Sequence, residues 1–183
     1  MRYLCTLAIL LPTLFTSSVQ AGDFSTRGIV GLTDLQPALS FDGSSTARYV
    51  GRSFSRQIGF NFQTGTILPD PTTVDNSRLE SEGILTFEGD QGPNPFYRNR
   101  RLHVIYTRYG RIHCTWHAVF TAQFFPDGTA ILKGDGEFTI VGGTGRFRNA
   151  SGRFQTLFET LPIQATANSA LARFTQSGTL NRR

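Results

Sequence analysis

The stretch Asp127–Glu159, DGTAILKGDGEFTIVGGTGRFRNASGRFQTLFE, decides the fold predicted for this chain. Two short runs rich in β-branched and aromatic residues, Thr129–Lys133 and Glu137–Val141, are bounded by glycine and aspartate, which is typical of strands. We expect tight turns at Asp127-Gly128 and at Gly134-Asp135-Gly136, because glycine accepts a positive φ without steric cost. The stretch therefore predicts consecutive antiparallel strands joined by glycine turns.

The glycine cluster at 142–145 also has to be considered as a phosphate-binding loop. A P-loop requires a Lys-Ser or Lys-Thr pair after its last glycine and a helix behind it. Here Arg146 and Phe147 follow, and the next run, Arg153–Glu159, is typical of a strand. We therefore interpret the glycines as residues that shape the backbone.

A resemblance to a known family lies in the same segment. GGTGRFRNASG at 142–152 resembles the GGTGxFRxAxG segment of dirigent proteins and of the related allene oxide cyclase-like barrels. Val50-Gly51-Arg52 resembles a dirigent VGR tripeptide. The resemblance implies an eight-stranded antiparallel β-barrel with an apolar central cavity. Family members steer radical coupling, cyclise reactive intermediates or have no known reaction, and they form dimers or trimers, so it also implies a homodimer or homotrimer.

The rest of the chain agrees with an all-β fold, either a barrel or a β-sandwich, because it has many short strand-like runs and no convincing long helix. Alternation over Tyr49–Gln63 predicts a strand with Ile58, Phe60 and Phe62 on one face. Thr64–Asn76 contains two prolines and is expected to be a loop.

The run Arg78–Asp90 is expected to be a further strand, with three carboxylates, Glu80, Glu82 and Glu88, on the same face. Such a row could supply acid–base groups if it lined a cavity. It is more often the solvated side of a half-exposed strand.

Residues 1–21 have the pattern of a secretory signal peptide. Arg2 supplies the positive charge, Leu4–Phe15 the short apolar run, and Val19-Gln20-Ala21 the small residues of a cleavage site. The apolar run is too short for an ordinary transmembrane helix, so we expect no membrane span. The prediction is one exported domain, residues 22–183, in an extracellular or periplasmic location, where Cys114 is the remaining cysteine and is expected to be buried.

The chain is basic, with 18 Lys and Arg against 13 Asp and Glu and a formal net charge of +5. A basic balance can attract nucleic acid. The arginines are scattered along the sequence, however, and no nucleic-acid motif accompanies them. We therefore predict no nucleic-acid partner.

The section Arg101–Phe125 is the most suggestive chemically, because it holds all three histidines together with Tyr106 and Trp116. We expect a hairpin turned near Tyr109-Gly110. On a strand His113 and His117 would be roughly 13 Å apart, too far to share a metal ion. We expect no metal site, and no cofactor motif is present.

Aromatic and histidine side chains with apolar bodies and polar tips suit the lumen of a barrel. The ligand-binding candidates are Tyr106, Trp116 and His103, and the catalytic candidates are His117, Tyr106 and Glu82. Three interpretations remain open: a dirigent-like barrel that binds or orients a small, mostly apolar or aromatic ligand, a cofactor-independent cyclase or isomerase, and a structural secreted protein with a filled barrel. An ionisable pair inside the lumen would favour catalysis.

Overall fold

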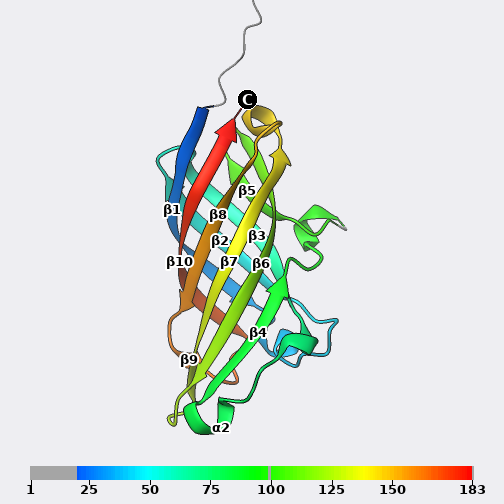
Figure 1. The fold of residues 1–183 in the computed structure, drawn as a ribbon, viewed down its shortest axis with the longest axis vertical. Helices are drawn as coiled ribbons and strands as arrows, with labels where there is room; N and C mark the ends of the chain where they lie inside the picture. Colours follow the sequence, from blue (N-terminus) through cyan, green and yellow to red (C-terminus); the bar gives the residue numbers. More distant parts are fainter. Residues whose placement is uncertain (1–19, 99, 183) are drawn as a thin grey trace, which may run out of the picture.

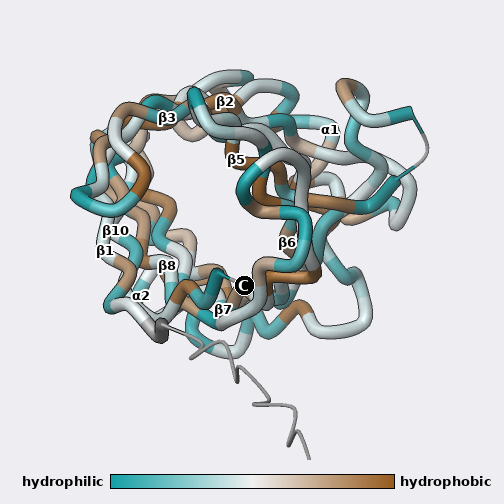
Figure 2. The backbone as a smooth tube through the Cα atoms, turned by 90° about the horizontal axis from the view of Figure 1, so that it is seen from above, coloured by the Kyte–Doolittle hydropathy of each residue, from teal (hydrophilic) through white to brown (hydrophobic). Residues whose placement is uncertain are grey.

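The computed structural model describes residues 20–98 and 100–182. It confirms the predicted fold, a closed eight-stranded antiparallel β-barrel, with β4 and β9 as two additional strands (Figure 1). Viewed along the barrel axis, the strands form a closed ring (Figure 2). The strands are β1 Gln20–Thr33, β2 Ala47–Ser55, β3 Gly59–Pro69, β4 Ile84–Asp90, β5 His103–Thr107, β6 Gly110–Phe124, β7 Thr129–Gly143, β8 Gly152–Thr160, β9 Ile163–Gln164 and β10 Ser169–Arg182. The helical turns are α1 Leu35–Ala38, η1 Pro71–Thr73, α2 Leu79–Glu82, η2 Pro95–Tyr97 and η3 Gly145–Phe147.

The wall follows the order β1, β2, β3, β5, β6, β7, β8 and β10, and it closes where β10 pairs with β1. That last pairing runs along the whole of β1, from Gln20 opposite Arg182 to Thr33 opposite Ser169. Closure leaves none of these eight strands with an unpaired edge, which removes the edges at which open sheets associate. The signal peptide predicted for Met1–Ala21 falls almost wholly outside the described residues.

One position of the wall, between β3 and β6, is shared by β4 and β5, which lie end to end. β4 pairs with β6 as far as Asp90, opposite His117, and β5 resumes the pairing at His103, opposite Cys114. Both strands also pair with β3. Residues 91–98 and 100–102 therefore form an excursion between two halves of one strand position, and they project from the side of the barrel (Figure 1).

Several predicted turns are confirmed. The chain reverses at Asp127-Gly128, where Gly128 has a φ of 80°, and between β5 and β6 at Arg108 and Tyr109. The glycine cluster at 142–145 ends β7 and leads into η3, with Gly142 at φ 123° and Gly145 at φ 59°. These positive φ values explain why glycine is used at both positions.

The turn predicted at Gly134-Asp135-Gly136 is wrong, because β7 runs without interruption over Thr129–Gly143. The glycines have a different role there. A Cβ at Gly134 would lie 2.0 Å from the ring of Phe158, which projects from the neighbouring strand β8. Gly134 is therefore required for space inside the barrel rather than for reversal of the chain.

The strand predicted over Arg78–Asp90 is correct only from Ile84 onward. Leu79–Glu82 forms the short helix α2, and Gly83 ends it in the left-handed conformation at φ 67°. The three carboxylates of this segment consequently do not share one face of a strand: Glu80 and Glu82 lie on α2, and Glu88 lies on β4.

The strand predicted over Tyr49–Gln63 is a hairpin of β2 and β3, turned at residues 56–58. The face that carries Phe60 and Phe62 is the outer one, whereas Ile58, predicted on the same face, is buried in the turn. Phe60 is 83% exposed and Phe62 38% exposed, whereas Asn61 and Gln63 are buried in the lumen. The loop predicted for Thr64–Asn76 is also wrong in its first half, because β3 continues to Pro69.

Alternation along the strands fills the barrel with aromatic side chains. Phe24, Phe120, Phe147 and Phe154 are all fully buried. Phe138 stacks on Phe154 with ring centroids 5.0 Å apart. Among the described helices, none is long and apolar enough to cross a membrane.

Candidate functional site

A cavity of about 60 Å³ remains inside the barrel between these aromatic side chains. Most of its wall is apolar, and its larger side chains include Leu32, Ile67, Phe120, Phe138, Phe158 and Phe174. Six side chains with polar atoms also reach it: Tyr49, Gln63, His103, Trp116, Thr156 and Gln176. The volume suffices for a few water molecules or a small group of heavy atoms, and it is well below that of a pocket for a drug-sized ligand.

The polar centre of the cavity is a hydrogen bond between Tyr49 on β2 and His103 on β5. The Tyr49 hydroxyl lies 2.7 Å from Nδ1 of His103, and the two rings are stacked with centroids 5.7 Å apart. β3 runs between these two strands, and Gly65 is the β3 residue opposite Tyr49. A Cβ at Gly65 would lie 2.2 Å from the Tyr49 hydroxyl oxygen. The missing side chain of Gly65 therefore lets Tyr49 reach across β3.

Burial keeps this pair uncharged at neutral pH. Desolvation lowers the pKa of His103 from 6.5 to about 3. Desolvation also raises the pKa of Tyr49 far above its ordinary value, and the nearby Trp116 indole offsets this only in part. The pair therefore offers neutral hydrogen-bonding groups to the cavity rather than an ion pair.

Three buried polar atoms around this cavity have no hydrogen-bond partner: Nε2 of His103, Nε1 of Trp116 and Oγ1 of Thr156. The indole nitrogen of Trp116 lies near the Tyr49 hydroxyl but does not meet hydrogen-bond geometry. An orphaned buried polar group costs about 1–3 kcal/mol. Water molecules, or a ligand with hydrogen-bonding atoms, could satisfy these three atoms from within the cavity.

The break in the wall between β4 and β5 helps to position Trp116. Its backbone N–H, which faces the break, donates a hydrogen bond of 2.6 Å to Oε1 of Gln91, the first residue of the excursion. The Trp116 ring stacks on Phe138 with centroids 5.6 Å apart and an interplanar angle of 19°. Packing and backbone bonding thus fix the indole, which is the condition for a well-aimed N–H donor.

A second polar group in the lumen is fully satisfied. Gln63 and Gln176 exchange two hydrogen bonds of 3.0 Å across the barrel interior. Gln63 also donates to Ser53 and to Asn61, at 3.0 and 3.1 Å. These amides line the same cavity but have no free hydrogen-bonding capacity of the kind left on His103.

The structure brings only two of the sequence-predicted site residues together. His103 and Trp116 both line the cavity, on β5 and β6. Tyr106 lies on the outer face of β5, with its ring 6.1 Å from that of Phe62. His117 is on the outside of β6, exposed, with Nε2 3.3 Å from a carboxylate oxygen of Glu88.

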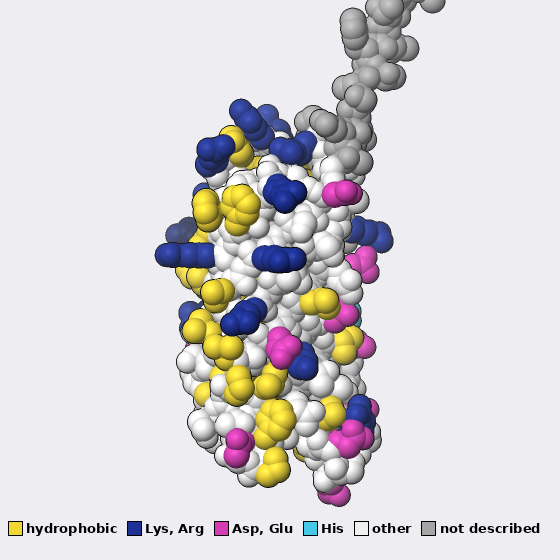
Figure 3. Space-filling view, turned by 90° about the vertical axis from the view of Figure 1, so that its left-hand side faces the viewer, with side chains coloured by type: hydrophobic (Ala, Val, Ile, Leu, Met, Phe, Trp, Pro, Cys, Tyr) yellow, Lys and Arg dark blue, Asp and Glu magenta, His cyan; other side chains and the backbone are white. Residues whose placement is uncertain are grey.

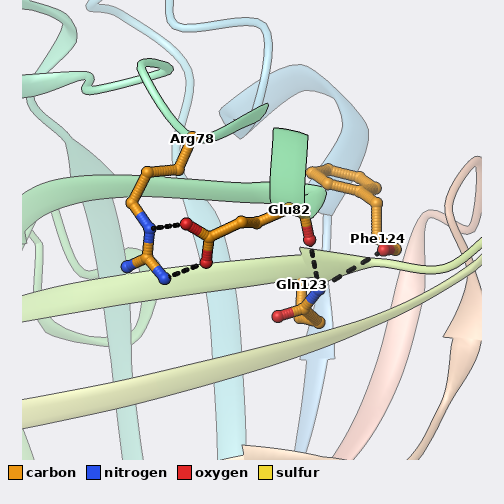
Figure 4. A network of polar contacts seen from close by, with 4 residues as sticks. All are labelled: Arg78, Glu82, Gln123 and Phe124. Atoms are coloured by element: carbon orange, nitrogen blue, oxygen red, sulfur yellow. Dashed lines mark hydrogen bonds and ion pairs between the residues drawn. The ribbon is translucent and has the colours of Figure 1, made fainter. Parts of the chain in front are cut away.

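Glu82 lies far from the lumen, at the end of α2. Its carboxylate pairs with the guanidinium of Arg78, and its backbone carbonyl accepts a hydrogen bond of 2.8 Å from Gln123 (Figure 4). The hydrogen bond from Arg78 is the main cause of the lowered pKa of Glu82. This pattern is that of an exposed (i, i+4) pair at a short helix.

The structure also describes the environment of Cys114 and the distribution of possible metal ligands. Cys114 is buried, as predicted, and burial raises its thiol pKa, so it is neutral and shielded from reagents. Among residues 20–98 and 100–182, no cluster of three or more His, Cys, Asp or Glu is placed to hold a metal ion.

Sequence reasoning missed Tyr49 and Thr156. Period-two alternation puts Tyr49, Gly51 and Ser53 on one face of β2, but it does not say that this face is the inner one. For Thr156 no local signal exists, because its role comes from the cavity that distant strands enclose.

Comparison with known proteins finds no match: no protein-family model, curated protein or solved structure is similar to the chain. Membership of the dirigent or allene oxide cyclase-like families therefore stays a prediction from residues 142–152.

Proposed function

We propose that this protein is an exported, dirigent-like barrel that binds or orients a small, mostly apolar or aromatic molecule carrying at least one hydrogen-bond acceptor. The observation that carries the proposal is the set of three unpartnered polar atoms, on His103, Trp116 and Thr156, around one apolar cavity. A carbonyl or ether oxygen of the ligand would accept from the Trp116 indole. The cavity of about 60 Å³ would have to widen by side-chain movement to admit an aromatic ligand, whose apolar body the aromatic walls would then hold.

The tautomer of His103 determines which hydrogen-bonding group it presents to a ligand. When Tyr49 donates to Nδ1, the imidazole proton sits on Nε2 and points away from Tyr49. Nε2–H and the indole N–H of Trp116 are then two donors without partners. Two neutral donors suit a carbonyl oxygen, whereas an anion would have to give up its hydration for uncharged partners.

A cofactor-independent cyclase or isomerase is the second candidate, and one observation favours it: the lumen contains an ionisable pair, Tyr49 and His103. The pKa values weigh against acid–base work by that pair. Burial lowers the pKa of His103 to about 3, so the imidazole is neutral at pH 7. The Tyr49–His103 pair could still polarise and position a reactive carbonyl, so turnover would come from orientation of the substrate rather than from proton transfer.

The export and assembly of the protein are part of the proposal. Residues 1–21 support export by their pattern, and the dirigent resemblance supports a homodimer or homotrimer. Sedimentation of the mature chain measures the assembly. A structural protein with a filled barrel is the alternative if the cavity takes up no ligand.

Calorimetric titration with two molecules of matched shape tests the binding proposal. Acetophenone carries a carbonyl, whereas ethylbenzene has a similar size and none. We expect acetophenone to bind at least tenfold more tightly, because one hydrogen bond to a buried, otherwise unpartnered donor is worth about 1.5 kcal/mol. Trp116→Phe should abolish this preference.

The matched control is Gln123→Leu on the outer end of β6, which should leave both affinities unchanged. Equal affinity for the two molecules in the wild type would contradict the hydrogen-bonding part of the proposal. Absence of binding by either molecule, together with a lumen filled only by water at high resolution, would leave the structural alternative.

A further inference from the structure

The outer surface over β1, β2, β3 and β5 is hollowed, with a volume of about 1010 Å³. Its exposed side chains, such as Ile29, Arg52 and Phe54, point away from the lumen, and its lining shares no residue with that of the cavity inside the barrel. Five of the twelve exposed large hydrophobic side chains among the described residues line it: Ile29, Val50, Phe54, Phe60 and Phe62. Concentration of exposed apolar side chains in one concave place marks an interaction site.

Three arginines, Arg27, Arg52 and Arg108, also line the hollow, and no carboxylate does. None of the three takes part in the ion pairs found among the described residues. The face that carries β1 and β10 shows the same character, with dark blue and yellow side chains close together and few magenta ones in its upper half (Figure 3). The partner of this hollow must therefore bring negative charge.

The pairing register shows how closely the charges and the apolar groups alternate. Arg52 on β2 stands between Ile29 on β1 and Phe62 on β3. Arg27 stands opposite Phe54, which in turn stands opposite Phe60. Directly opposite residues have Cβ atoms about 5 Å apart. A partner that satisfies both kinds of group must carry an anionic group within about one side-chain width of its apolar part.

We propose that this hollow binds an anionic amphiphile, a molecule with an acyl-like apolar body on Ile29, Phe54 and Phe60 and a phosphate, sulfate or carboxylate head on Arg52. The hollow is broad and open to solvent, so the amphiphile would lie along the strands at the surface rather than inside an enclosed pocket. Arginine forms paired hydrogen bonds with phosphate and carboxylate oxygens, and it is less strongly hydrated than lysine.

Two other occupants fit less well. A second copy seated face to face would place three arginines against three arginines without a carboxylate between them. Single-stranded nucleic acid needs free aromatic faces for its bases. Here Ile29 and Val50 have no ring, and Phe54 and Phe60 pack edge to face, with ring centroids 5.1 Å apart and an interplanar angle of 62°. An acyl chain needs only apolar contacts, which Ile29, Val50, Phe54 and Phe60 all provide.

The test is calorimetric titration of the mature protein with decyl phosphate below its micellar concentration, alongside decyl maltoside and inorganic phosphate. We expect decyl phosphate to bind at least tenfold more tightly than either control. Arg52→Gln and Phe60→Ser should each weaken it at least tenfold. Phe60 is 83% exposed, so its replacement does not threaten the fold.

Gly31→Leu provides an independent test, because Gly31 lines the hollow and the nearest atom to an added Cβ is 3.9 Å away. The leucine should occupy the hollow and reduce binding without a change in charge. Arg153→Gln on β8, outside the hollow, is the matched control and should bind as the wild type does.

Co-sedimentation with vesicles distinguishes the source of the amphiphile. Binding to phosphatidylglycerol vesicles but not to phosphatidylcholine vesicles would identify lipid in a bilayer, and binding of decyl phosphate alone would identify a single free molecule; both support the anionic-amphiphile site. Unchanged affinity in Arg52→Gln, loss of binding in the lumen variant Thr156→Val, dimer formation through this face, or tighter binding of a ten-nucleotide oligothymidine would overturn it.

Discussion

The Tyr49 hydroxyl lies 2.7 Å from Nδ1 of His103 although a strand runs between them. The contact exists because Gly65, opposite Tyr49 on β3, has no side chain to block it. One glycine thus places a tyrosine, a histidine and the adjacent indole of Trp116 around the same cavity. This arrangement connects the fold of the barrel to its proposed function.

Gly65→Ala should break that contact. The added Cβ would lie 2.2 Å from the Tyr49 hydroxyl oxygen, so the Tyr49 ring must move. The buried hydrogen bond between this hydroxyl and the His103 imidazole is then lost. We expect a loss of about 1–3 kcal/mol in the free energy of unfolding, measured with urea. Gly31→Ala, whose Cβ has no atom closer than 3.9 Å, is the control and should be near neutral. Equal stability of the two variants would show that Tyr49 is not held as described.

Acid should destabilise the protein through His103. Its pKa is about 3 in the folded chain and 6.5 when unfolded, so the unfolded state binds more protons between these values. The contribution is present above pH 6.5 and is lost as the pH falls towards 3. At pH 4 the loss is about 3 kcal/mol.

Urea unfolding at pH 7 and pH 4 in the wild type and in His103→Gln measures this contribution. Exposed carboxylates with lowered pKa values, such as Asp42 and Asp127, act in the same direction in both proteins and cancel in the comparison. The variant should be clearly less sensitive to acid. An identical pH dependence would mean that His103 titrates normally.

The amide pair in the lumen should behave as a coupled unit. Gln63→Leu leaves Gln176, Ser53 and Asn61 short of a partner in a buried place, so we expect a loss of about 2–4 kcal/mol. Gln63→Leu with Gln176→Leu should cost less than the sum of the two single changes, because the second removes a group already left unpaired. Additive losses in urea unfolding would argue against the pair.

Gly134→Ala should be destabilising by about 1–3 kcal/mol, because its Cβ would lie 2.0 Å from the ring of Phe158. Phe158→Ala removes that ring and should reduce the penalty of Gly134→Ala in the double variant. Thermal unfolding of the four proteins measures the coupling. A penalty that persists in full without the ring would place the requirement for glycine in the backbone instead.

Strand alternation and glycine turns are local signals, and residues 127–159 carry many of them, so the sequence predicted an all-β fold. The eight-stranded barrel was expected from the resemblance of residues 142–152 to dirigent-like barrels. The prediction failed at Gly134, since glycine needed for a turn and glycine needed to clear a phenylalanine ring look the same in sequence. Alternation placed Phe60 and Phe62 on one face of a strand but did not say whether that face is the inner or the outer one. In most soluble barrels the hydrophobic face of a strand lies inside, whereas here Phe60 and Phe62 are exposed and line the outer hollow.

The candidate site was predictable only in part. His103 and Trp116 were identified because they combine polar tips with apolar bodies. Tyr106 has the same chemistry, and nothing in its neighbourhood says that it faces outward. Tyr49 depends on Gly65 and His103, residues 16 and 54 positions away along the chain, and such relationships appear only when the strands are aligned.

The most direct test of ligand binding in the lumen uses the indole N–H of Trp116, the single tryptophan of the chain. It should give one indole peak in a ¹H–¹⁵N correlation spectrum. Titration with acetophenone should shift that peak progressively to the position of a hydrogen-bonded indole, and ethylbenzene should not. An indole peak that stays in place up to saturating acetophenone would contradict the proposal that the lumen binds a ligand through Trp116.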